Sequence, residues 1–133
     1  MLIFFDLNGM KYFNLKFGFA EGDNLIRAFS RLLVEHFTHT SCCRFGMDRF
    51  CVCTDDTNLE DRLWKLFDDC ENINNGKSLP VRAGIYSSKM GACGASFACD
   101  KAKMACDSSR NIYVSHFTYF NDSMLQQSEK RQY

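Results

Sequence analysis

The sequence predicts a fold of the α/β type (α+β), in which helices flank one mixed five-stranded sheet. Strand-like apolar segments alternate with helix-periodic segments along the chain, which favours a sheet covered by helices. Two strand segments are separated only by Gly46-Met47-Asp48, a tight-turn pattern that predicts a hairpin and hence a mixed sheet. With 133 residues, of which 46% are hydrophobic and one is proline, the chain has the length and composition of one domain with a substantial core.

The predicted elements follow the order β-α-α-β-β-α-β-α-β. The first strand is an apolar run that ends at Asp6, as expected for a buried strand. Apolar residues recur at the helical period in Asp23–Phe37. The spacing of Thr57 and Glu60 predicts a capping box at the start of the third helix. We expect strands at Leu2–Phe5, Ser41–Phe45, Phe50–Thr54, Val81–Tyr86 and Ile112–Phe120, and helices at Asn8–Phe17, Asp23–Phe37, after Glu60, and at Ser96–Asp107.

Charge and hydropathy exclude several classes of protein. Sixteen basic and sixteen acidic residues give no net charge, which argues against a generally basic nucleic-acid binder. No apolar stretch approaches the roughly 18 residues that span a bilayer, so no membrane segment is expected in this chain. Met1–Asp6 is too short for a signal peptide. These observations predict a cytoplasmic protein.

Eight cysteines raise the question of a disulfide scaffold or a metal site. A scaffold of that kind is usually shorter, poorer in core residues and secreted. The sequence has no Cys-x-x-Cys motif, and its three histidines do not pair with cysteines at the spacing of a zinc site. We therefore expect reduced thiols that pack as small hydrophobic side chains.

Two carboxylates are candidates for chemistry. Asp6 ends the first strand and Asp48 lies in the hairpin turn, and these two elements can be neighbours in a sheet of this order. Two carboxylates with a nearby backbone carbonyl suit Mg²⁺, which keeps open positions for phosphate. On spacing alone, two solvated carboxylates at a turn and a strand end are the favoured explanation of the pattern.

Five segments resemble the GGDEF domains of the diguanylate cyclase family. The segments FDLNGMKYFN (5–14) and FGFAEGD (17–23) resemble the family's opening block, D-x-D-x-F-K-x-x-N-D-x-x-G-H-x-x-G-D. The segment RFGMDRF (44–50) falls where the family has R-x-G-G-D/E-E-F, and VRAGI (81–85) resembles a later strand. Residues 98–111 lie over the closing segment of the family. The resemblance implies a polymerase-palm-like fold and an activity that joins two GTP into cyclic di-GMP with Mg²⁺.

The resemblance also assigns roles to single residues. It implies that Asp6, the Leu7 carbonyl and Asp48 would hold Mg²⁺. Asn14 and Asp23 would hydrogen-bond the guanine edge, which offers donors to a carboxylate and acceptors to an amide.

In the phosphate region, the resemblance places Gly46 where the backbone approaches the phosphates and Arg110 where a cation reaches them. GTP or a related guanine nucleotide is the implied ligand.

Four residues depart from the family's motif. Met47 replaces a glycine beside the phosphates, so its side chain would crowd them. Arg49 replaces the signature acid and inverts its charge, so no catalytic residue is expected. Cys106 falls on a phosphate-contacting lysine, and Asn8 replaces an aspartate.

Domain organisation follows from the same resemblance. We expect a degenerate GGDEF domain over residues 1–120 and a linker or connecting helix over residues 121–133. The family's first helix, which precedes the first strand, is absent from this sequence and would leave part of a sheet face without its cover. The closing residues resemble degenerate GGDEF domains that precede an EAL phosphodiesterase domain. The implied partners are an adjacent EAL or sensor domain and a second copy of the chain.

Three functions remain open at this stage. The first is a catalytically inactive, regulatory GTP-binding module in cyclic di-GMP signalling. The second is an active diguanylate cyclase with a rebuilt signature motif. The third is a dimerisation or docking domain that binds no nucleotide.

Overall fold

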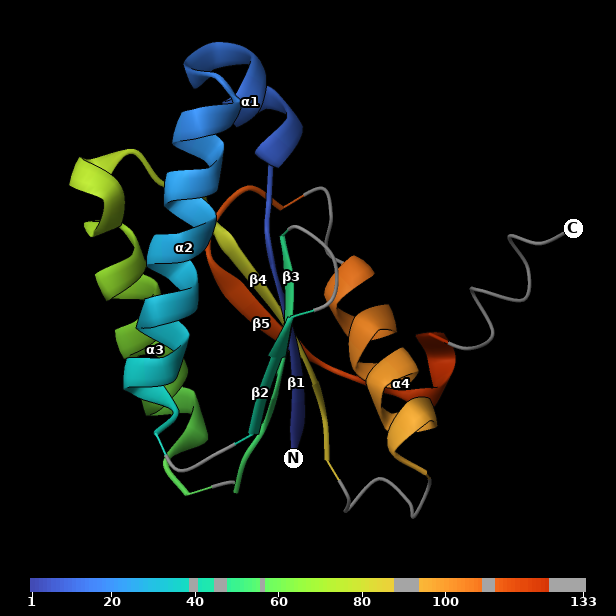
Figure 1. Cartoon of the computed structure of the whole chain (residues 1–133). Coiled ribbons are helices and arrows are strands. Elements are labelled where there is room, and N and C mark those ends of the chain that lie inside the picture. Colours follow the sequence, from blue (N-terminus) through green and yellow to red (C-terminus); the bar gives the residue numbers. More distant parts are fainter. Residues whose placement is uncertain (39–40, 45–47, 56, 88–93, 109–111, 125–133) are drawn as a thin grey trace, which may run out of the picture.

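A mixed five-stranded sheet in the order β2-β3-β1-β4-β5 forms the centre of the fold, with helices on both faces (Figure 1). The computed structural model describes residues 1–38, 41–44, 48–55, 57–87, 94–108 and 112–124. The strands are β1 (Leu2–Leu7), β2 (Ser41–Arg44), β3 (Arg49–Cys53), β4 (Val81–Tyr86) and β5 (His116–Tyr119). The helices are α1 (Met10–Phe17), α2 (Phe19–His36), α3 (Leu59–Cys70), the short 3-10 helix η1 (Ile73–Gly76) and α4 (Ala95–Asp107). This order confirms the predicted fold class.

Strand β1 lies in the middle of the sheet and is covered on both faces. It pairs antiparallel with β3 and with β4, while β4 and β5 run parallel. Residues 3–7 of β1 are all buried, which explains why its sequence is a continuous apolar run rather than an alternating one.

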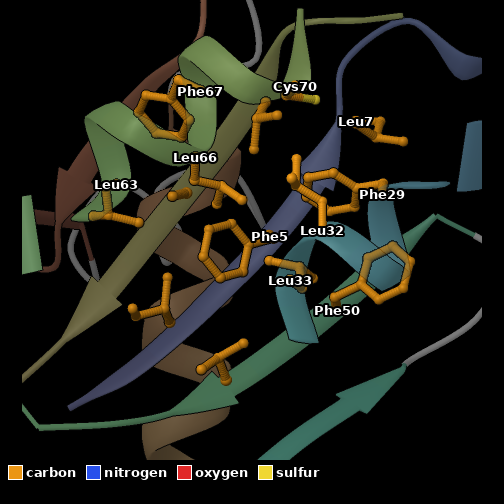
Figure 2. Packing of buried hydrophobic residues seen from close by; sticks show 14 of the residues in the cluster. Phe5, Leu7, Phe29, Leu32, Leu33, Phe50, Leu63, Leu66, Phe67 and Cys70 are labelled. Carbon is orange, nitrogen blue, oxygen red and sulfur yellow. The ribbon is translucent and has the colours of Figure 1, made fainter. Parts of the chain in front are cut away.

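The larger hydrophobic core lies between the sheet and helices α1, α2 and α3. Phe5 of β1 projects into this core, and its ring lies 6.3 Å from that of Phe29 in α2 (Figure 2). Leu63 and Leu66 of α3 complete the contact, and both are fully buried. Full burial of one such side chain contributes about 1.5–3 kcal/mol, so this layer supplies most of the hydrophobic stabilisation.

Helix α4 covers the opposite face of the sheet. A second cluster there joins Phe4 of β1, Tyr86 of β4 and the small side chains Ala102 and Ala105 of α4. The helix comes very close to β4 at Gly84, where an added Cβ would lie 2.0 Å from the Ala102 carbonyl oxygen. This close approach positions the end of α4 beside the ends of β1 and β4.

Most element boundaries lie within two residues of the sequence prediction, and the larger differences concern α2, β5 and the start of α3. Helix α2 begins at Phe19, and strand β5 covers only His116–Tyr119 because the residues before it are largely exposed. The predicted capping box is wrong: Asn58, with φ 51°, is the N-cap residue of α3 and makes no side-chain capping hydrogen bond. The Thr57 amide instead donates to Asp55, which forms a turn of its own.

The C-terminal segment is described only in part. Residues 122–124 form a short helical turn, and the rest of the predicted linker, residues 125–133, lies outside the described residues. Among the helices that the structure describes, none is long and apolar enough to cross a bilayer.

Substitution of Gly84 tests the close packing of α4. We expect Gly84→Ala to lower the free energy of unfolding by at least about 3 kcal/mol, because the methyl group meets helix backbone that cannot rotate away. Gly94→Ala is the matched control, since a Cβ there meets nothing within 4 Å. Urea unfolding measures both, and equal stability of the two variants would contradict the expectation.

Candidate functional site

Three strands bring charged residues to one end of the sheet, on the face that α4 covers. Asp6 of β1 lies directly opposite Arg49 of β3 and opposite Arg82 of β4. Directly opposed residues in antiparallel strands point to the same face, so all three side chains lie on one side of the sheet. The strand register therefore places one carboxylate between two guanidinium groups.

Asp6 and Arg82 form a buried, two-pronged ion pair. Arg82 Nε donates to Asp6 Oδ1 at 2.8 Å, and Arg82 Nη2 donates to Asp6 Oδ2. The exposed fractions of the side chains are 6% for Asp6 and 10% for Arg82. The remaining nitrogen, Arg82 Nη1, is buried and has no hydrogen-bond partner among the described residues. This geometry is the strong, charge-assisted form of the arginine–carboxylate interaction.

Burial acts on both charges of this pair. It raises the pKa of the Asp6 carboxyl, and the hydrogen bonds and charge of Arg82 oppose that rise without cancelling it. Burial by itself would lower the pKa of the Arg82 guanidinium, but its hydrogen bonds to Asp6 and the charge of Asp6 outweigh this effect and raise it. The buried charge of each residue is thus stabilised by the opposite charge of its partner.

Further acidic groups surround the pair. Asp48 lies directly before β3 and is half-buried, and together with Asp107 at the end of α4 it raises the pKa of Asp6. One ligand atom each of Asp6, Cys106 and Asp107 lies within 4.8 Å of the others. The Cys106 thiol donates to the Arg82 carbonyl oxygen at 3.6 Å, and burial raises its pKa, so it is a neutral thiol. Among the described residues, Arg82 and Arg49 supply the positive charge that balances these carboxylates.

Asn14 and Asp23, the predicted guanine contacts, lie in α1 and α2. The side-chain oxygen of Asn14 is buried and has no hydrogen-bond partner among the described residues. It lies over Gly22, where an added Cβ would be 1.9 Å from it, and Asp23 follows Gly22 in the chain and is exposed. An unsatisfied buried oxygen beside an exposed carboxylate leaves hydrogen-bonding capacity for a ligand.

The other predicted site residues have different positions. Gly46, Met47 and Arg110 lie outside the described residues. Leu7 is the last residue of β1 and pairs with Val81. Asn8 donates to the Ile112 carbonyl oxygen at 2.9 Å, so it ties the end of β1 to the segment that precedes β5.

The sequence model of the family described as "Diguanylate cyclase, GGDEF domain" matches residues 1–102. The chain belongs to the GGDEF family. This family acts in cyclic di-GMP signalling, and its match covers the strands that carry Asp6 and Arg82 as well as Asp48 directly before β3. No curated protein matches the chain significantly.

Solved GGDEF structures share the fold at low sequence identity. An EAL/GGDEF domain protein from M. capsulatus is 21% identical, with a TM-score of 0.75 over 90% of this chain and 83% of that chain. The active GGEEF domain of a diguanylate cyclase from Vibrio cholerae is 16% identical, with a TM-score of 0.78 over 91% and 82%. The GGDEF domain of DgcB from Caulobacter crescentus, solved with c-di-GMP, is 19% identical, with a TM-score of 0.73 over 89% and 75%. At these identities the comparison establishes the fold.

Diguanylate cyclases of the GGDEF family use Mg²⁺, and the donor set at Asp6 bears on that requirement. Both Asp6 oxygens already accept hydrogen bonds from Arg82. A divalent cation at Asp6 would lie beside a buried guanidinium, and like charges repel strongly where water is excluded. Mg²⁺ also requires several well-placed oxygen ligands. The described residues do not fit a divalent cation at Asp6 in this arrangement.

Sequence reasoning missed Arg82, the residue that decides the chemistry of this site. The sequence around Arg82 has the pattern of an ordinary strand. Only the register of β4 against β1 places Arg82 opposite Asp6. A buried arginine in an apolar strand is a usable signal, because arginine is rarely buried without a carboxylate partner.

Removal of one partner tests the ion pair. We expect Asp6→Ala to lower the free energy of unfolding by about 3–5 kcal/mol, because it leaves the Arg82 guanidinium buried and unpaired. The matched control is Asp55→Ala, which breaks an exposed pair with Arg62 (3.5 Å) and should cost less than about 1 kcal/mol. Chemical unfolding of both variants measures the difference, and a small loss for Asp6→Ala would disprove the structural role of the pair.

Proposed function

We propose that this GGDEF domain is a regulatory, catalytically inactive module that binds GTP or a related guanine nucleotide. The observation that carries this proposal is the buried pair of Asp6 with Arg82. It engages the carboxylate that the family resemblance assigns to the metal, while Asn14 and Asp23, which the resemblance assigns to guanine, are both present in the chain. In this proposal the site binds a guanine nucleotide but does not convert it to product.

The charges around Asp6 argue against turnover. Arg49 takes the place of the signature acid, and a guanidinium neither accepts a proton nor binds a cation near neutral pH. Arg82 neutralises Asp6 from the other side. Phosphoryl transfer between two nucleotides requires compensation of the charge that develops on the phosphate and a group that takes the proton of the attacking hydroxyl. Asp6 itself is engaged by Arg82 through both carboxylate oxygens and is not available to take this proton.

Guanine recognition is supported by the α1–α2 hairpin. In this proposal the Asn14 side chain turns away from Gly22, so that its oxygen accepts from a base donor or its amide group donates to the guanine carbonyl. Asp23 is exposed on the next helix and can accept from the N1–H and N2–H₂ groups of guanine. A buried polar atom without a partner costs about 1–3 kcal/mol, and a bound base would recover this cost.

The phosphate end of the site depends on guanidinium groups in this proposal. Arg49 is exposed at the end of β3, and Arg110, though outside the described residues, is the further candidate by resemblance. Arginine binds phosphate through paired hydrogen bonds and needs no metal to do so. We therefore propose that Mg²⁺ contributes little to nucleotide binding here.

The remaining parts of the proposal concern the surroundings of the domain. We propose a cytoplasmic location, a second copy of the chain or an adjacent EAL or sensor domain as partner, and a connecting role for residues 121–133. The structural likeness to an EAL/GGDEF domain protein supports the EAL partner.

Calorimetric titration with GTP tests the binding part. We expect saturable binding, and we expect Asn14→Ala and Asp23→Ala each to weaken it by about tenfold or more, since each loses a hydrogen bond to the base. Asn24→Ala, an exposed neighbour of Asp23 on α2, is the matched control and should leave affinity unchanged. No saturable heat with the unaltered chain would refute nucleotide binding and favour a docking domain.

Titration with GTP in buffer that contains Mg²⁺ and in buffer that contains a chelator tests whether nucleotide binding needs the metal. A product assay tests for turnover. We expect similar GTP affinity in both buffers, and no cyclic di-GMP in chromatograms of long incubations at high protein concentration. Formation of cyclic di-GMP would show an active cyclase and overturn the inactive assignment. A large loss of affinity on chelation would show that a cation displaces Arg82 from Asp6.

A further inference from the structure

Four of the eight cysteines gather on the face of the sheet that α4 covers. Cys43 comes from β2, Cys51 and Cys53 come from β3, and Cys99 comes from α4. They are separated by up to 56 positions in the chain (99 − 43), and no pair has a metal-motif spacing in the sequence. Only the tertiary structure brings them together.

Strand register fixes three of these thiols on one face. Cys43 lies directly opposite Cys51 in the β2–β3 pair, and Cys53 lies two residues further along β3, where the side chain returns to the same face. Cys51 is also opposite Phe4 of β1, and Phe4 belongs to the cluster that α4 covers. Cys42 is opposite Val52, which belongs to the other core, so its side chain lies on the opposite face.

Cys99 lies on α4, the helix that covers the face of the sheet where the other three cysteines lie. It is half-buried and packs against the Phe4 cluster, and it is the neighbour with the largest influence on the pKa of the Cys51 thiol. Burial, followed by Cys99, Cys43 and Cys53 in that order, raises the pKa of Cys51 to about 12. A bound cation would take the place of the thiol protons, because the thiolate is the form of cysteine that binds metals.

We propose that Cys43, Cys51, Cys53 and Cys99 form a binding site for one soft divalent cation of the Zn²⁺ type. Four thiolates are a standard tetrahedral donor set, with metal–sulfur distances of about 2.3 Å. Thiolates also select such cations over Mg²⁺, which prefers oxygen ligands. The site is separate from the nucleotide site at Asp6.

Binding requires a modest movement of two side chains. No three of these sulfur atoms lie within 4.8 Å of one another in the described structure, so the thiols must converge on the cation. Cys43 and Cys53 are exposed and can rotate inward, whereas Cys51 is buried and fixed by its neighbours. Arg49, two residues before Cys51 on the same face, adds positive charge that offsets the thiolates.

A cation at this site would tie α4 to β2 and β3. Cys106 and Asp107 follow Cys99 by seven and eight positions, which is about two helical turns, and they lie close to Asp6. The position of α4 thus connects the cysteine face with the charged end of the sheet. Metal binding would stabilise the domain, because a ligand that binds only the folded state raises its free energy of unfolding.

Optical titration with Co²⁺ is the direct test, because tetrahedral thiolate coordination gives visible d–d bands and a sulfur-to-metal charge-transfer band. With the reduced chain, we expect one Co²⁺ per chain, displacement by Zn²⁺ and a higher thermal unfolding temperature with Zn²⁺. Cys53→Ser and Cys43→Ser change exposed side chains, so both variants should fold, as circular dichroism will check. Each should weaken Co²⁺ binding by about tenfold or more.

The controls separate this site from the other cysteines. Cys42→Ser, an exposed cysteine on the same strand but on the opposite face, should leave the Co²⁺ spectrum and affinity unchanged. Cys51→Ser should abolish the tetrahedral spectrum. The proposal is overturned if no charge-transfer band appears, if the bands survive in Cys43→Ser and Cys53→Ser, or if Cys42→Ser removes them.

Discussion

The buried ion pair between Asp6 and Arg82 is the interaction on which the site of this domain depends. It links the central strand β1 to β4 at the end of the sheet where the family resemblance expects a metal. Removing either residue would leave a charge in a place from which water is largely excluded, so the two residues must be kept together. A substitution of either residue would therefore destabilise the domain unless the other residue changed as well.

This pair also explains why the domain keeps its fold while it departs from the signature motif. The sheet order, the hydrophobic core and the close approach of α4 at Gly84 need no metal and no acidic signature. The carboxylate of Asp6 needs a cation, and Arg82 supplies one as part of the protein itself. The stability of this fold therefore does not depend on a bound metal, which is consistent with a regulatory role.

Helix α4 connects the two parts of the molecule that carry our proposals. Its small side chains allow contact with β4, its last turn brings Asp107 beside Asp6, and its first half brings Cys99 beside Cys51. A helix held against bare backbone at Gly84 has little freedom to shift independently of the strand. Changes at the cysteine face and at the charged end of the sheet are therefore mechanically related.

The sequence alone determined the order of elements and the family. Apolar runs, helical periods and the FDLNGMKYFN segment are local patterns, and local patterns survive without knowledge of the third dimension. They placed Asp6, Asn14, Asp23 and Asp48 among the candidate residues. Boundaries failed where a local signal competed with another, as at Thr57, whose turn with Asp55 replaces the expected capping box.

Only the tertiary structure decided what those residues contact. Arg82 lies 76 positions from Asp6, and Cys99 lies 48 positions from Cys51, so their meetings depend on strand register and on helix packing. A register shift of one residue would send each strand side chain to the opposite face. No pattern within a single segment contains that information, which is why the ion pair of Asp6 with Arg82 could not be predicted from the sequence.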